Sequence, residues 1–287
     1  MISDFLSSWD LFHNTYLTAW SLAVLLSLAG VWVVARNQIF LGAAVSQASL
    51  LGVATSLFLG SLGFLGGAGW ESHETAHAFV GGAFAVVAAL VAARPGGSGS
   101  DSREAMTGWI FLLGSSGAVL LLSHHPHGLE EVNQLTASSI LGATPVELAC
   151  IVTLLVATLV VMSRGVGPLI LLATDPEMAA AVGLRVRGAS ISLCVWLGLT
   201  IGLSLHAAGL AYTFGCLVLP PLAAKHLCRE IRSMVVVSPI VALASAVIAC
   251  IVAHRLDLPP GQATVALLCL VVAVTWGYRQ LRTHRRS

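Results

Sequence analysis

Long apolar segments separated by short polar ones dominate the chain. Nine of them lie at about 16–36, 40–60, 75–94, 105–123, 147–163, 190–206, 209–226, 233–253 and 262–281. Most approach the roughly 20 apolar residues that a helix needs to cross the hydrocarbon core of a bilayer. Because they are continuously apolar and do not alternate, they predict spanning helices and not the strands of a barrel. The pattern predicts an all-α polytopic membrane bundle of about 8–9 transmembrane helices.

The composition agrees with lipid as the main solvent of this chain. Apolar residues make up 57% of the 287 positions and charged residues 9%, whereas soluble domains carry roughly 25% charge. No internal repeat and no second soluble domain stand out, so we expect one transmembrane domain over 1–287. A net charge of +1 gives no strong positive electrostatic field to attract nucleic acid, so we exclude nucleic acid as a partner.

The basic residues predict the orientation of the spans, because cytoplasmic loops are enriched in Lys and Arg. With nine spans and the C-terminus inside, 13 of the 14 basic residues fall on the cytoplasmic side, and only Arg255 falls outside. We therefore expect a multi-pass protein of the cytoplasmic (inner) membrane, with its N-terminus outside and a cytoplasmic tail at 279–287. The alternative concerns 190–226, where Gly202 and Gly209 can instead mark a broken helix.

The most specific local pattern lies in the predicted cytoplasmic segment 172–188. Thr174 or Asp175 suits a helix N-cap, Pro176 the first helical position, and Glu177 the first turn. Gly183 suits the position just after a helix C-terminus. These residues predict a short amphipathic helix beneath the membrane, which is either a surface connector or a docking element for a cytoplasmic partner.

Four stretches of the chain resemble a known family. They are 40–52, 140–147, 175–184, and 208–221 taken with 256–261; the third follows the pattern Asp-Pro-Glu-x-Ala-x-x-x-Gly-Leu closely. Together they make the chain similar, from about 16 to 281, to the permease subunits of ABC importers for manganese, zinc and iron. No single stretch is specific alone, but the four in this order are.

The resemblance implies a homodimer around a central pathway, with a cytoplasmic ABC ATPase docked on each copy and an extracytoplasmic solute-binding protein delivering the substrate. The substrate would be a divalent transition metal, zinc or manganese, transiently bound, with no permanent cofactor. The chain would have no catalytic site, since it contains no phosphate-binding loop. The residues implied in ATPase coupling are Asp175, Pro176, Glu177, Ala181, Gly183 and Leu184, and those implied along the pathway are Ser46, Gln47 and Gly209.

The chain departs from this family in the stretch 40–52. Where the family has Asp and His four residues apart, implicated in metal coordination, this chain has Ala43 and Gln47. Alanine cannot ligate, and an amide is a poor ligand for transition metals. We expect His206, near the outer end of a span, to be the replacement, because ionisable residues inside membranes are usually functional. The alternative is a histidine that hydrogen-bonds a carbonyl between helices.

Histidines also gather in the predicted outer segments. His73 and His77 belong to an H-E-x-x-H sequence that places both on one helix face, and His124, His125 and His127 surround Pro126. Imidazoles in such spacing can attract zinc. Each group can be an outer metal-attracting site. The alternative for His73 and His77 is a solvated helix cap, and the alternative for His124, His125 and His127 is an ordinary polar loop.

Two rival functions remain open from the sequence. H-E-x-x-H is also the signature of zinc proteases, so an intramembrane metalloprotease using His73, Glu74 and His77 is one alternative. The motif's place at the outer edge of a span argues against it, as does the lack of a convincing third ligand. The second is an ion-coupled secondary transporter, which needs buried Asp, Glu or Lys within its spans; the predicted spans contain almost none.

Overall fold

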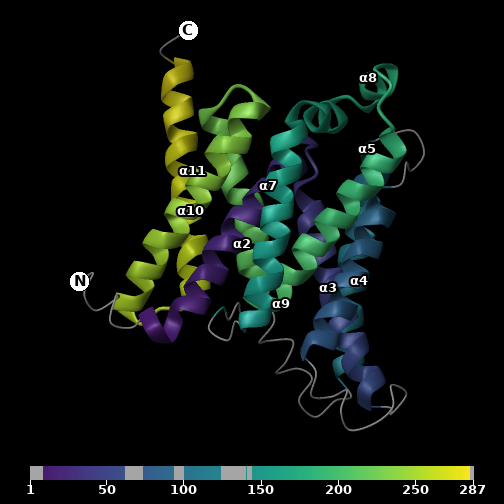
Figure 1. Ribbon diagram of the computed structural model, residues 1–287, viewed down its shortest axis with the longest axis vertical. Helices are drawn as coiled ribbons and strands as arrows, with labels where there is room; N and C mark the ends of the chain where they lie inside the picture. Colours follow the sequence, from purple (N-terminus) through teal and green to yellow (C-terminus); the bar gives the residue numbers. More distant parts are fainter. Residues whose placement is uncertain (1–8, 62–73, 94–99, 124–139, 141–143, 285–287) are drawn as a thin grey trace.

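A computed structural model describes residues 9–61, 74–93, 100–123, 140 and 144–284. The regular elements of these residues are helices, and no strand occurs among them. They are α2 (Trp9–Ala35), α3 (Ile39–Ser61), α4 (Glu74–Ala92), α5 (Ser100–Leu122), α7 (Pro145–Thr174), α8 (Pro176–Ala181), α9 (Val186–Leu227), α10 (Ile231–Leu256) and α11 (Pro260–His284). The prediction of an all-α bundle is confirmed (Figure 1).

Helix length and composition confirm a multi-pass membrane protein. Seven of the described helices are long and apolar enough to cross a membrane, namely α2, α3, α5, α7, α9, α10 and α11. The apolar part of α4, Ala76–Ala92, is slightly shorter. Since α9 has 42 residues, about twice the length of one crossing, its path decides how many spans the described residues form.

Helices α2, α3 and α4 cross the bundle in alternating directions. Only a short turn, 36–38, separates α2 from α3. Ser56 of α3 hydrogen-bonds His77 of α4, and Gly52 packs against Gly81, so later positions in α3 meet earlier ones in α4. It follows that α2 and α4 run in the same direction and α3 runs back between them.

The first half of α9 runs opposite to α4. A side chain on Gly198 would meet Val86, and one on Gly202 would meet Gly82, so the order of contacts is reversed between the two helices. At Gly202 the two backbones approach closely, which explains a glycine there without any break; the structure keeps this position helical. The alternative break at Gly202 is therefore not observed.

The second half of α9 runs the other way, alongside α2. Tyr212 donates a hydrogen bond of 2.7 Å to the backbone oxygen of Ala19, and Lys225 reaches Asn37, just past the end of α2, at 3.4 Å. The change of direction occurs at Gly209, whose φ of 76° and ψ of 174° interrupt the helical geometry. Because α9 therefore crosses twice, the described residues form nine crossings, and each coincides with a predicted apolar segment.

An odd number of crossings leaves the beginning of α2 and the end of α11 at opposite ends of the bundle (Figure 1). The end that carries α8 also holds the end of α11, the end of α9 and the start of α10. Of the basic residues whose side chains are described, Lys225, Arg229, Arg232 and Arg279 belong to these ends of α9, α10 and α11, and Arg185 and Arg187 follow α8. Arg36 follows α2 and bonds Leu172 just before α8, and Arg164 precedes the interruption of α7 at Gly165. Arg255 belongs to the opposite end of α10. We call the first end the α8 end and the second the far end.

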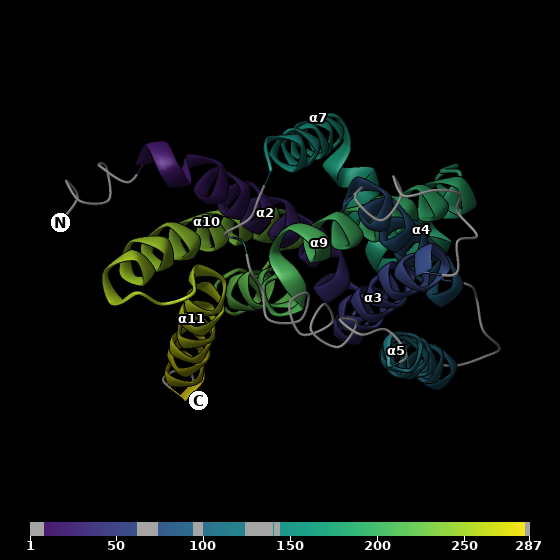
Figure 2. The same ribbon diagram turned by 90° about the horizontal axis from the view of Figure 1, so that it is seen from below.

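Helix α2 is the centre of the bundle. In its most apolar window 78% of the residues are buried, against 17% for α7 and 22% for α11. Seen from below, α2 is surrounded by α7, α9 and α10, while α5 and α11 lie at the edges (Figure 2). At Gly30 the backbone of Leu217 and the ring of Pro221 occupy the space of a side chain. Small residues here let α2 and α9 pack at close range, as in many membrane bundles.

Helix α7 is longer than the predicted span 147–163. Its helical backbone geometry is interrupted at Gly165 (φ −163°, ψ 47°), and Pro168 follows in the next turn. The second segment crosses the α8 end of the bundle (Figure 1), where Leu172 and Ala173 are buried. Arg36 donates a hydrogen bond of 3.2 Å to the Leu172 oxygen. The bundle thereby fixes the point from which α8 starts.

Candidate functional site

The short helix α8 has well-formed caps at both ends. Asp175 is the N-cap residue, and its carboxylate accepts a hydrogen bond of 2.9 Å from the Met178 backbone N–H. Pro176 opens the helix, as expected of a residue with fixed φ and no N–H to lose. At the other end Gly183 has φ 86°, and the Leu184 N–H donates to the Ala179 oxygen at 3.0 Å. The sequence prediction of this helix is confirmed, with Asp175 and not Thr174 as the cap.

Helix α8 exposes an apolar surface beyond the bundle. Ala179 is fully buried and anchors it, whereas Met178 is 54% and Val182 68% exposed. Glu177 and Ala181 are also exposed. Figure 1 shows α8 projecting from its end of the molecule, away from the spans. A rigidly capped element with exposed apolar side chains is suited to insertion into a groove of another protein.

At the far end, His206 meets a carboxylate. Its Nε2 lies 3.6 Å from Oε1 of Glu147, which links α9 to the first turn of α7. The other carboxylate oxygen of Glu147 accepts from the backbone N–H of Thr144 at 2.8 Å, within a complete capping box. The Thr-x-x-Glu spacing was a sequence signal for this cap, but nothing in the sequence pointed to the pairing with His206.

The His206–Glu147 pair has the chemistry of a weak cation site. Imidazole and carboxylate are both ligands for zinc and manganese. Nδ1 of His206 is buried and has no hydrogen-bond partner among the described residues. In the part of the chain that the structure describes, no three His, Cys, Asp or Glu residues lie close enough to hold a metal. Two ligands suit transient contact better than firm retention, since firmly held zinc keeps four.

Ser46 and Gln47 are buried inside the bundle. The Ser46 hydroxyl donates to the Gly42 oxygen of its own helix at 2.9 Å. Gln47 is 8% exposed, and its side-chain oxygen has no partner in the described structure. Gly114 of α5 packs directly on the Gln47 backbone. A pathway role for Ser46 and Gln47 remains a prediction.

The histidines that the sequence predicts to lie outside are only partly described. His77 is 8% exposed, and its Nδ1 pairs with the Ser56 hydroxyl across the α3–α4 contact. This bond, which the sequence did not reveal, occupies one of the two nitrogens that a metal could use. His73, His124, His125 and His127 lie outside the described residues, so their predicted metal role keeps the status of a hypothesis.

Comparison with known proteins identifies a family and several relatives of this chain. Residues 8–277 match the ABC 3 transport family. The chain is 25% identical over 259 residues to "Chelated iron transport system membrane protein YfeD" of Yersinia pestis, covering 90% of this chain and 82% of that protein. It is 21% identical to "Manganese import system permease protein ScaB" of Streptococcus gordonii, covering 96% and 95%.

Solved structures share the fold. "PsaBC from Streptococcus pneumoniae in complex with Fab" superposes with a TM-score of 0.77 at 19% identity, over 96% of this chain and 95% of that chain. A structure described as an inward-facing conformation of a putative metal-chelate type ABC transporter gives 0.72 at 15% identity, over 98% and 90%. Because the family match extends over nearly the whole length of the nine-crossing bundle, the chain belongs to the ABC 3 transport family.

Proposed function

We propose that this chain is the membrane subunit of an ATP-driven importer for a divalent transition metal, zinc or manganese. Two copies would form the pathway, each docked on a cytoplasmic ABC ATPase, and an extracytoplasmic binding protein would deliver the metal. The relatives named for manganese import and chelated iron transport support the substrate class. The choice of zinc rests on the predicted outer histidines alone.

The observation that carries the proposal is α8. It is capped at Asp175 and Gly183, anchored by Ala179, and exposes Met178 and Val182 beyond the spans. Such a helix can transmit a movement of a soluble ATPase to the spans. Its caps keep it folded as one unit, and the buried Leu172 anchors the segment that precedes it. The predicted coupling role of Pro176, Glu177, Ala181 and Leu184 follows from their places in or next to this helix.

The charge distribution supports the proposed orientation. Eight basic residues with described side chains belong to the α8 end and one to the far end. Since cytoplasmic segments are the ones enriched in Lys and Arg, we place α8 and the end of α11 in the cytoplasm of the cell and the start of α2 outside. His206 and Glu147 then face the outer side, where a delivered metal would arrive.

The rival functions have less support. Among the described residues, the buried polar side chains are serines, threonines, Gln47 and His77. An ion-coupled carrier needs buried Asp, Glu or Lys in its spans, and this list contains none of them. For a metalloprotease, His77 would have to bind zinc while its Nδ1 is held by Ser56.

Cross-linking tests the coupling role. In a background in which the six native cysteines are replaced, we expect Glu177→Cys and Ala181→Cys to cross-link to the ATPase in isolated membranes. Leu258→Cys, exposed at the far end, is the matched control and should not. Cross-links from Leu258→Cys, or labelling of Glu177→Cys by a reagent that cannot enter cells, would overturn both the coupling role and the orientation.

A further inference from the structure

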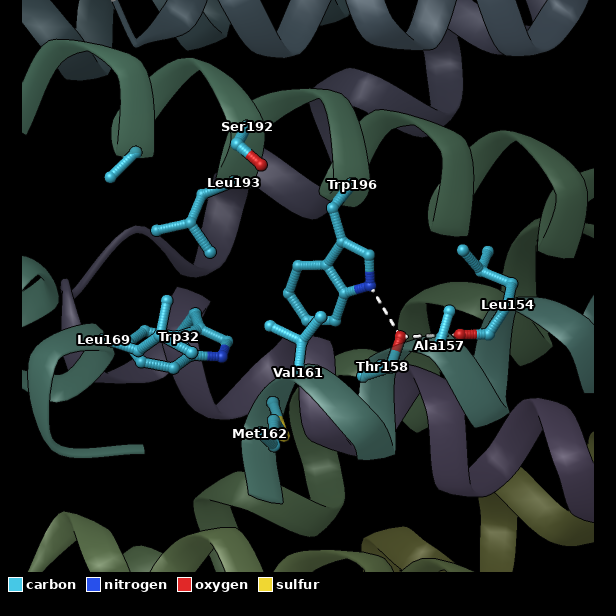
Figure 3. A pocket seen from close by; sticks show the side chains of 11 residues that line it. Trp32, Leu154, Ala157, Thr158, Val161, Met162, Leu169, Ser192, Leu193 and Trp196 are labelled. Carbon is cyan, nitrogen blue, oxygen red and sulfur yellow. Dashed lines mark hydrogen bonds between the residues drawn. The ribbon is translucent and has the colours of Figure 1, made fainter. Parts of the chain in front are cut away.

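An apolar cavity opens between α7 and α9 in the half of the bundle nearer α8. Its volume is about 270 Å³. It is lined by Trp32, Leu154, Ala157, Thr158, Val161, Met162, Leu169, Ala189, Ser192, Leu193 and Trp196. Figure 3 shows the Trp196 ring between the two helices, with Val161 and Met162 below it and Trp32 and Leu169 to one side. The cavity is thus a hydrocarbon-walled space between two spans.

Two polar side chains in its wall, Trp196 and Thr158, are paired with each other. Trp196 Nε1 donates to the Thr158 hydroxyl at 2.8 Å, and that hydroxyl donates to the Leu154 oxygen at 2.7 Å. Figure 3 draws this chain of bonds along one side of the space. Away from Ser192 at the rim, the wall that faces a ligand is mostly apolar side chains. An engineered apolar cavity of about 150 Å³ already takes up benzene, so this larger one suits a hydrocarbon chain.

The apolar track continues toward the far end. A second, more open cavity of about 650 Å³ shares Leu154 and Ala157 with the first and extends along α7 and α9 to Pro145 and Leu203. On the outer surface of α7, Val156 and Val161 are more than half exposed. An elongated apolar ligand could therefore lie along the α7–α9 seam within the membrane-spanning length.

The α8 end of the seam is basic. Arg164 lies one turn after Val161 of the cavity wall, and Arg185 lies one turn before Ala189, whose N–H donates to the Arg185 oxygen at 3.0 Å. Residues one turn apart share a helix face, and both arginine side chains are exposed, as is that of Arg187. Ser192, also exposed, offers a hydroxyl at the rim. The seam thus combines an apolar slot with positive charge at one mouth, the arrangement that holds anionic lipid headgroups between spans.

We propose that the α7–α9 seam binds a phospholipid with an anionic headgroup. One acyl chain fills the cavity beside Trp196, and the phosphate lies between Arg164 and Arg185. Which leaflet supplies the lipid rests on the orientation proposed above and would be the inner one. Because α7 leads into α8 and α9 leads out of it, such a lipid ties together the two helices that carry α8 and would support its position.

Native mass spectrometry of the full-length chain in mild detergent tests this, with phosphatidylglycerol and phosphatidylcholine of identical acyl chains as probes. The wild type should retain phosphatidylglycerol preferentially. Each arginine should contribute roughly fivefold, equivalent to about 1 kcal/mol, so Arg164→Gln with Arg185→Gln should abolish the preference. Ala157→Trp, which fills the cavity, should reduce retention of both lipids.

Matched controls separate the site from general effects. Arg229→Gln removes an exposed arginine elsewhere at the α8 end, and Ile240→Trp adds an indole on the exposed face of α10; both should behave as wild type. If Ala157→Trp does not accumulate, Ser192→Trp at the rim gives the same measurement. Equal retention of the two lipids by the wild type, or unchanged retention in the filled variant, overturns the proposal.

One further outcome would also overturn it. A dimer that is lost in Ala157→Trp and insensitive to lipid would mean that a second copy of the chain occupies the seam. Because the measurement needs neither the ATPase nor a metal, its failure would leave the importer proposal standing, and failure of the importer proposal would leave the lipid result standing.

Discussion

Replacing Gly209 with alanine tests the reversal inside α9. Its φ of 76° with ψ of 174° lies in a region that is essentially restricted to glycine, and holding another residue there costs of order 1–3 kcal/mol. The residue is buried, so the chain around it has little room to relax. We expect Gly209→Ala to lower the folded-to-unfolded ratio roughly five- to 150-fold.

Gly188 provides the control in the same helix. It is helical, and a Cβ there would meet nothing within 4 Å. Alanine is favoured over glycine in helix interiors by about 1 kcal/mol, so Gly188→Ala should be neutral or slightly stabilising. The fraction of each variant that stays monodisperse in gel filtration after a temperature series measures the difference. Equal heat resistance of the two variants would mean that Gly209 is an ordinary helical residue and that α9 does not turn back there.

Four other substitutions address the site and the core. His206→Ala should cut metal uptake strongly without reducing the protein in the membrane, whereas Gln47→Ala should be mild; the reverse result would point to the α3 segment as the substrate contact and to a chelated substrate. Asp175→Ala removes the α8 cap, worth about 1 kcal/mol, and should weaken ATP-driven uptake while the melting temperature of the bundle is retained; uptake at the wild-type rate would contradict the coupling role. Tyr212→Phe removes a buried hydrogen bond worth about 1 kcal/mol and should lower the melting temperature, and an unchanged value would argue against the bond to Ala19.

Local patterns in the sequence were enough to predict the spans. Each described crossing coincides with an apolar run, since a spanning helix needs such a run and little else. Asp175, Pro176 and Gly183 predicted α8 because helix caps are formed by residues only a few positions apart in the sequence. The segment of α7 after Gly165 was not predicted, because it is held by packing on α2 and by the Arg36 bond, neither of which leaves a local signature.

The candidate site was harder to predict for the same reason. The sequence singled out His206 and His77, but their partners, Glu147 and Ser56, come from other helices. The seam beside Trp196 is formed by residues more than thirty positions apart, as its hydrogen bond to Thr158 illustrates. Such pairings depend on which faces of two helices meet, and a nearly uniform apolar sequence does not specify this.

The central position of α2 has a consequence for synthesis. Its closest partners include Tyr212, which is 193 residues later in the chain, and Ser238, which is 211 residues after Ser27. At translation rates of about 5–20 residues per second, the first span leaves the ribosome roughly 10–40 s before the helix that encloses it exists. During that interval the faces of α2 that finally pack on α9 and α10 have neither of these helices to contact. Assembly in the membrane therefore has to end where synthesis began, with the late helices closing around the earliest one.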